Sequence, residues 1–287
     1  MPFTIVPTRT TADPNSAADV NTLMENTSYL NSTLIPIITT KSKVLNGLLL
    51  SNAADPDHDI AISTGSCIDS TGTYVLTIAS PITKQIDVTW VAGTGNGGIA
   101  TALHPVQNTT WYYVYIIRKD SDGTIDVVFD TSITAANKPA GYTYYLRIGA
   151  VRTDGSANLR RFTQFQNIFT WETPVDDYTA SNPGTSVVTT AVTAPPNYLA
   201  IIRWMVYQDS AISQYGRFFS TSAVDQTAGN QYYNTDHQTS NIDSGAWRHY
   251  TKNIMTNSSS QVCFRLALSA AYVTTSIHAL GYYESYS

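Results

Sequence analysis

Short runs of hydrophobic residues separated by glycine, proline and asparagine turns extend over most of this 287-residue chain. Residues 111–119 form an aromatic and β-branched run, Asp122 and Gly123 supply a tight turn, and residues 124–130 return as a second such run. This pattern predicts a β-hairpin. A second hairpin is predicted between residues 144–151 and 159–166. Earlier strands are expected at residues 44–51, 60–63, 73–80 and 82–90, with a further strand at 165–173.

One segment near the N-terminus has the periodicity of a helix instead. Ser16 and Asp19 resemble a capping box, and Pro36 ends the helix. One narrow face of this helix carries Val20, Leu23, Thr27, Leu30 and Leu34, which are 3, 4, 3 and 4 residues apart. This is the spacing of a heptad repeat, and it favours a short parallel bundle of helices from identical chains. Packing of the helix on its own β domain is the alternative. The predicted seam consists of these five residues.

Strand patterns resume beyond a turn-rich stretch around Asp176, Asp177 and residues 181–184. The sequence therefore predicts an arm and helix at 1–43, a β body domain at 44–176 and a distal β domain at 177–287. The fold class is mainly β, with two antiparallel β domains, and the short strands of the second favour a sandwich or jelly-roll-like fold. Its strands are expected at residues 185–193, 198–207, 216–220, 261–268 and 276–283.

Composition supports the β assignment and narrows the partners. Charged residues make up only 13% of the chain and aromatic residues 11%, whereas hydrophobic residues reach 43%, too many for a disordered chain. A net charge of −5 argues against a nucleic-acid partner, and we interpret Arg160 and Arg161 as a solvated strand end. No apolar run approaches the ~20 residues of a membrane span, so no membrane insertion is expected. Cys67 and Cys263 are predicted to be reduced core residues, consistent with assembly in a bacterial cytoplasm.

Two loops invite a ligand-binding interpretation. Asp55, Asp57 and Asp59 could hold calcium, but Ile60 and Ser66 occupy the places where an EF-hand loop needs Gly and Glu. An Asx turn before a strand is the favoured interpretation, and no metal site is predicted. The glycine-rich residues 93–98 lack a following helix to bind phosphate, so we expect a wide hairpin connection there.

Catalytic patterns are weak in this sequence. None of the five histidines lies in a recognisable nucleophile motif, and only three glutamates are present to supply a glycosidase carboxylate pair. We therefore expect no enzyme activity and no cofactor.

A polar region late in the chain suits binding. Aromatic faces beside amide and carboxylate groups recognise sugars or polar protein surfaces. The alternative is that these are ordinary loop residues that pack under their own domain or at a seam between chains. The candidate receptor-binding residues are Tyr232, Tyr233, Asp236, His237 and Trp247.

The order of several segments also resembles a known family. Asp55–Ile60 reads DPDHDI, residues 84–90 read KQIDVTW and residues 93–98 read GTGNGG, ahead of the hairpin block at 111–166. Together they resemble the repeated body domain of bacteriophage tail-fibre and related virion fibre proteins, over roughly residues 45–175. The resemblance implies a structural attachment protein of a virus particle, built of three identical chains.

The expected function follows from this resemblance. The protein would be a virion fibre or spike, assembled in the bacterial host cytoplasm, that docks on other virion proteins through residues 1–35. Its C-terminal domain would face a host-surface glycan or protein. A capsid or tail decoration or connector protein without receptor binding is the alternative, and a glycan-degrading enzyme is the third.

Overall fold

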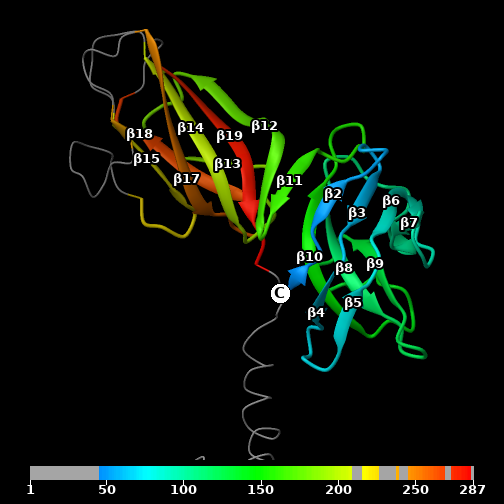
Figure 1. The fold of residues 1–287 in the computed structure, drawn as a ribbon. Helices are drawn as coiled ribbons and strands as arrows, with labels where there is room; N and C mark the ends of the chain where they lie inside the picture. The colour runs from blue at the N-terminus through cyan, green and yellow to red at the C-terminus, as the bar shows by residue number, and fades with distance from the viewer. Residues whose placement is uncertain (1–44, 209–214, 226–236, 239–244, 269–272, 286–287) are drawn as a thin grey trace, which may run out of the picture.

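The computed structural model describes residues 45–208, 215–225, 237–238, 245–268 and 273–285. This part of the chain is mainly β, as predicted, and forms four sheets with one short 3-10 turn, η2 (Thr101–Leu103). The sheets gather into two halves that meet along one side (Figure 1). The predicted helix and its seam residues lie outside the described residues. Within the described residues, no helix is long and apolar enough to cross a membrane.

The first half, which we call the body, contains a seven-stranded sheet that curls into a nearly closed barrel. Its first and last strands approach each other: a Cβ added at Gly149 would lie 2.5 Å from the side chain of Leu50. In spatial order the strands are β10 (Tyr144–Arg152), β8 (Trp111–Arg118), β9 (Ile125–Asp130), β7 (Asn96–Ile99), β6 (Ile82–Thr89), β3 (Asp59–Ile62) and β2 (Leu50–Asn52).

A small antiparallel sheet belongs to the same half. It lies close to β8 and β9, whose residues are buried along most of their length. Burial on both faces explains why these two strands read as continuous apolar runs rather than as alternating ones. The small sheet contains β1 (Asn46–Gly47), β4 (Gly65–Ile68) and β5 (Val75–Ile78).

The first predicted hairpin is confirmed and the second is wrong. Strands β8 and β9 pair antiparallel across the Asp122 and Gly123 turn. After β10, in contrast, only an isolated bridge joins Thr153 to Leu159. The next strand, β11 (Phe162–Phe165), pairs with β12 (Ile168–Ser181) instead. The Phe162 ring packs 5.4 Å from that of Phe169 in β12, which draws this segment into the neighbouring sheet.

The sequence predicted a wide hairpin connection at the glycine-rich residues 93–98, and the structure differs from this prediction. The last residues of this segment enter β7, which runs parallel to both β6 and β9, so the body sheet is mixed rather than antiparallel. The pattern hid this strand because glycine is depleted from strands. Here the backbones approach too closely for a side chain: a Cβ at Gly97 would lie 2.1 Å from the Thr89 carbonyl oxygen.

The second half, which we call the distal half, has two antiparallel sheets. The five-stranded sheet contains, in spatial order, β11, β12, β19 (Val273–Tyr283), β14 (Leu199–Gln208) and β17 (Ala246–Met255). The four-stranded sheet contains β13 (Val188–Ala191), β18 (Gln261–Leu266), β15 (Tyr215–Ser220) and β16 (His237–Gln238).

These two sheets pack face to face. Alternate residues of β14 are buried, and the Trp204 ring lies 5.6 Å from Phe218 and 6.2 Å from Phe264 of the opposite sheet. Across the same interior, Tyr178 lies 5.2 Å from Phe264. Strand β14 therefore has one face in the core, since successive side chains of a strand point to opposite faces of the sheet.

The structure also bears on the predicted state of the two cysteines and on the predicted domain boundary. Cys67 and Cys263 are both free and buried, in different halves, as predicted. The predicted division after residue 176 falls inside β12, which runs from Ile168 to Ser181 with register shifts but no break. The change from one half to the other occurs between β10 and β11.

We predict that Gly98→Ala destabilises the body. A Cβ there would lie 2.6 Å from the Phe129 ring and 2.9 Å from the Cβ of Lys84, so the new methyl group overpacks the space beside β7. The expected loss is about 1–3 kcal/mol in the free energy of unfolding, measured in urea. Gly155→Ala is the control, because a Cβ there meets nothing within 4 Å. Equal unfolding midpoints for the two variants would contradict this account of β7.

Candidate functional site: the seam between the two halves

Aromatic side chains from both halves form one cluster at the seam. Tyr282 of β19 stacks on Phe169 of β12 at 4.9 Å and meets Trp111 of β8 edge-on at 5.7 Å. Trp111 in turn lies 5.9 Å from Trp171. The Tyr282 hydroxyl donates a hydrogen bond to the carbonyl oxygen of Ala150 in β10. The hydrophobic core is therefore continuous across the seam.

A buried ion pair joins the same two halves. The Arg147 guanidinium of β10 lies 3.0 Å from the Glu284 carboxylate, which follows β19, and their side chains are only 1% and 0% exposed. The Tyr198 hydroxyl also donates to this carboxylate, at 3.2 Å. Burial raises the pKa of Tyr198, so its hydroxyl stays protonated and acts as a donor. Arg147 also donates a hydrogen bond to the Ser285 hydroxyl at 3.1 Å.

We predict that Glu284→Gln weakens the whole fold. The amide removes the charge that compensates buried Arg147, and breaking a buried pair in this way costs about 3–5 kcal/mol. Denaturant unfolding of the purified protein measures the loss. Glu172→Gln is the matched control, because Glu172 is exposed and its change should stay within about 0.5 kcal/mol. The seam would not depend on the ion pair if both variants unfolded at the same denaturant concentration.

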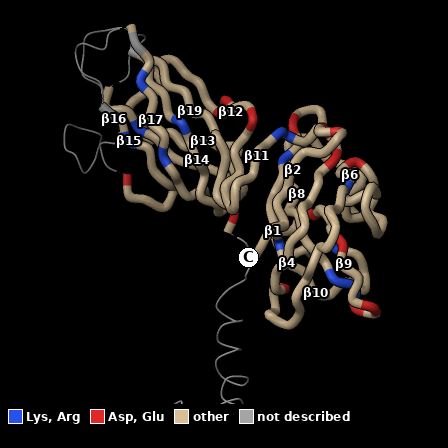
Figure 2. Tube along the Cα trace, viewed as in Figure 1, with Lys and Arg blue, Asp and Glu red and all other residues tan. Residues whose placement is uncertain are grey.

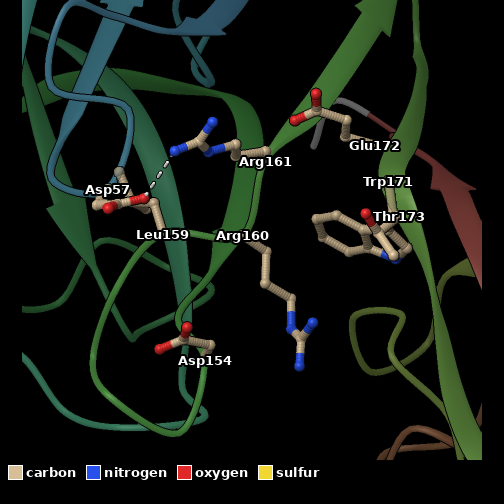
Figure 3. Close-up of a pocket in the computed structure, with 8 residues that line it drawn as sticks. All are labelled: Asp57, Asp154, Leu159, Arg160, Arg161, Trp171, Glu172 and Thr173. Atoms are coloured by element: carbon tan, nitrogen blue, oxygen red, sulfur yellow. Dashed lines mark hydrogen bonds and ion pairs between the residues drawn. The ribbon is translucent and has the colours of Figure 1, made fainter.

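A cleft of about 220 Å³ opens at the edge of the seam. It lies between the segment that leaves β10 and the first residues of β12, so both halves contribute to its walls. Polar and charged side chains dominate the lining, with Leu159 and Trp171 as its apolar members. The lining residues are Asp57, Asp154, Leu159, Arg160, Arg161, Trp171, Glu172 and Thr173 (Figure 3).

The two neighbouring arginines of this cleft have different environments. Figure 3 shows their side chains pointing to opposite sides. Arg161 lies 3.5 Å from Asp57 in an exposed ion pair, which fits its prediction as a solvated strand end. Arg160 is partly buried and reaches into the space between Asp154 and Trp171. Arg160 is solvated only in part, because the turn after β10 folds the side chain against β12 and buries its Nε.

A hydrogen-bond network behind the cleft fixes the position of Trp171. Its indole N–H donates to the Thr193 carbonyl oxygen at 3.1 Å. The Thr193 hydroxyl accepts from Arg152 at 2.5 Å and donates to Asp177 at 2.7 Å. Burial raises the pKa of Asp177, although these hydrogen bonds and the charge of Arg152 oppose that shift. The cleft therefore has a rigid wall on its β12 side.

The acidic loop before β3 is a local turn. The Asp55 carboxylate accepts from the backbone N–H of Asp57 at 3.3 Å and from the His58 ring at 3.0 Å. The hydrogen bond to Asp55 raises the pKa of His58. The Asx-turn interpretation is confirmed by these contacts. In the described part of the chain, no group of three or more His, Cys, Asp or Glu residues could hold a metal ion.

The predicted receptor-binding residues are mostly beyond what the structure covers. Tyr232, Tyr233 and Asp236 lie outside the described residues, and His237 is described only as backbone of β16. Trp247 is 44% exposed on β17. Its ring lies 5.3 Å from that of Tyr207, its partner on β14. The two side chains thus make an aromatic pair on the surface of the distal half.

The sequence pointed to none of the seam residues as a site. Arg152, Asp177 and Thr193 come together from three separate segments, so no local spacing signals their network. An available sign was the pair Arg160 and Arg161, two adjacent basic residues in a chain with few charges.

Comparisons with known proteins assign no family to this chain. No family model matches it, and no curated protein matches it. Among solved structures, a Bacillus thuringiensis Cry1Da tryptic core variant aligns with 85% of this chain at 9% identity and a TM-score of 0.20. This chain spans 54% of that structure. A likeness this weak carries no conclusion about fold or function.

Proposed function

We propose that this protein is a structural fibre or spike protein of a bacteriophage virion. It docks on other virion proteins through residues 1–35 and presents its distal half for attachment to a host-surface glycan or protein. The segment order that resembles virion fibre proteins supports this proposal. So does the composition, which is rich in Thr and Tyr and poor in charge.

The rigid seam is the observation that carries the proposal. Interfaces between domains of one chain are commonly polar and allow relative motion. Here the interface has a stacked aromatic core and a fully buried ion pair. A protein that projects from a particle and transmits pull from its tip to its base needs this kind of stiffness.

The geometry of the distal half fits a role in which the end far from the body faces the host surface. Leu199 pairs with Tyr283 beside the seam, whereas Tyr207 and its partner Trp247 lie at the other end of β14 (Figure 1). The exposed aromatic pair is therefore far from the body. We propose that the two distal sheets form a jelly-roll-like sandwich whose loops, including residues 222–245, contact the host. Loops on such a scaffold can vary without disturbing the core.

Both signs of charge occur in each half (Figure 2). On β14, β15, β17 and β18 of the distal half, however, every charged residue is basic. The runner-up function is a capsid or tail decoration or connector protein, whose distal half binds only other virion proteins. A glycan-degrading enzyme comes third.

Adsorption of particles to host cells tests the adhesive function. We expect Trp247→Ala combined with Tyr232→Ala and Tyr233→Ala to reduce adsorption at least about tenfold, because aromatic side chains dominate binding energy at interfaces. Val75→Ala is the control, since Val75 is exposed on the body. Thermal unfolding should be unchanged in both variants. Normal adsorption by correctly folded triple-variant particles would favour the connector function.

A homotrimer is the second expectation of this function. We expect light scattering of the purified protein to give three times the mass of the 31.3 kDa chain. Leu23→Asp combined with Leu30→Asp should lower that mass, because charges in the apolar seam of a coiled coil oppose association. A monomeric native protein at micromolar concentration would contradict the trimer.

A further inference from the structure

The Arg160 side chain has no hydrogen bond or ion pair that explains its position. Its Nε is buried and lacks a hydrogen-bond partner among the described residues. No described residue forms a hydrogen bond or an ion pair with the rest of its guanidinium, although the charge of Arg160 is near enough to oppose the rise that burial causes in the pKa of Asp177. A buried N–H without a partner is costly, and the other N–H donors of the guanidinium form a planar fork at the cleft. An acceptor from outside the chain would pair with this fork.

The groups around Arg160 define what this acceptor carries. On one side stand the Trp171 ring, 6% exposed, and the Thr173 hydroxyl. On the other side stands Asp154, whose Oδ1 accepts from the backbone N–H groups of Ser156 and Asn158. Its Oδ2 accepts no hydrogen bond from the described residues. The cleft therefore offers a cation, a carboxylate oxygen, a hydroxyl and an aromatic wall around one space (Figure 3).

We propose that this seam cleft binds one acidic sugar residue, such as a uronic acid. Its carboxylate accepts from the Arg160 guanidinium, and its hydroxyls donate to Asp154 and bond to Thr173. An apolar face of the sugar ring lies toward Trp171. Arg–carboxylate pairs are among the strong, charge-assisted hydrogen bonds, and the planar fork matches the two carboxylate oxygens.

Other ligand classes fit this set of groups less well. A phosphate dianion would place twice the negative charge of a uronate beside the carboxylates of Asp154 and Glu172, while Arg161 is already paired with Asp57. A neutral sugar would offer no carboxylate to the Arg160 guanidinium. The volume of about 220 Å³ is below the roughly 300–1,000 Å³ of pockets for drug-sized ligands, so it suits a single ring.

The network behind the cleft keeps this arrangement preformed. Trp171 is held through Thr193, and Thr193 is held by both Arg152 and Asp177. Burial lowers the pKa of Arg152, the nearby charge of Asp177 raises it and that of Arg160 lowers it. Asp177 therefore offsets part of the repulsion between the two guanidiniums, and an anionic ligand at Arg160 offsets more of it. A preformed site loses little entropy on binding.

The site deepens the proposed function, because a host-surface polysaccharide is the source of acidic sugars that an attachment protein meets. Its test, however, needs only the purified full-length chain. D-glucuronic acid is titrated in ligand-observed NMR, with D-glucose and inorganic phosphate as comparison ligands. We expect glucuronic acid to bind at least tenfold more tightly than either.

Matched variants locate the binding. Arg160→Gln should weaken glucuronic acid binding about tenfold or more, the effect of losing one charge-assisted hydrogen bond. Lys119→Gln, which removes the charge of a partly exposed side chain outside the cleft, should leave binding unchanged. Thr173→Val gives an independent measure, with a smaller loss. Thermal unfolding midpoints close to that of the native protein show that each variant is folded.

Three outcomes would overturn the site. These are absent binding of glucuronic acid, equal binding by the native protein and Arg160→Gln, and equal binding of phosphate or glucose. None of them bears on adhesion through the distal half. Conversely, glucuronic acid binding at Arg160 without any effect of Arg160→Gln on particle adsorption would keep the site and exclude its use in attachment.

Discussion

The ion pair between Arg147 and Glu284 is the interaction on which the arrangement of the two halves depends. Each side chain is fully buried in the assembled molecule, so removing either partner would leave the other as an uncompensated buried charge. Tyr198 links the pair to the aromatic cluster, because its ring lies 5.1 Å from the Arg147 guanidinium and 5.7 Å from the Tyr282 ring. The relative position of the two halves also fixes the geometry of the cleft beside Trp171, because both halves contribute to its walls.

The joint is built from residues distant in sequence. Glu284 contacts Arg147 across 137 positions, and β19 lies between β12 and β14 in the five-stranded sheet. Such pairings form only after large loops have closed, which makes folding slow compared with proteins rich in local contacts. The body, in contrast, contains the local β8–β9 hairpin, which can form early.

Local signals were the ones that the sequence could predict. The β8–β9 hairpin, the strand at β14 and the Asx turn at Asp55 each depend on neighbouring residues, and the structure contains all three. Strand β7 escaped prediction because its glycines are selected by the approach of Thr89 and Phe129, which lie elsewhere in the chain. The second hairpin failed because residues 162–165 pair with β12, where the Phe162 ring packs on Phe169.

The candidate site follows the same division. The side chains proposed from composition, such as Tyr232, belong to stretches that the structure does not describe, and they stay predictions. The Arg160 cleft, by comparison, exists only through tertiary packing. Arg160 is adjacent to Arg161, yet one is exposed and the other reaches into the seam. Sequence adjacency says nothing of this difference, because the strand direction after the turn decides it.

The way the body barrel closes has a consequence for many copies crowded together. Sheet edges are templates on which another chain can add a strand and start aggregation. Strand β2 is only three residues long, and its Leu50 N–H donates to the Gln164 side chain at 2.6 Å. The Leu50 side chain also covers the backbone of β10 at Gly149. Side chains thus block both edge strands of the barrel sheet. Copies that lie close together are therefore protected against adding strands to each other's sheets.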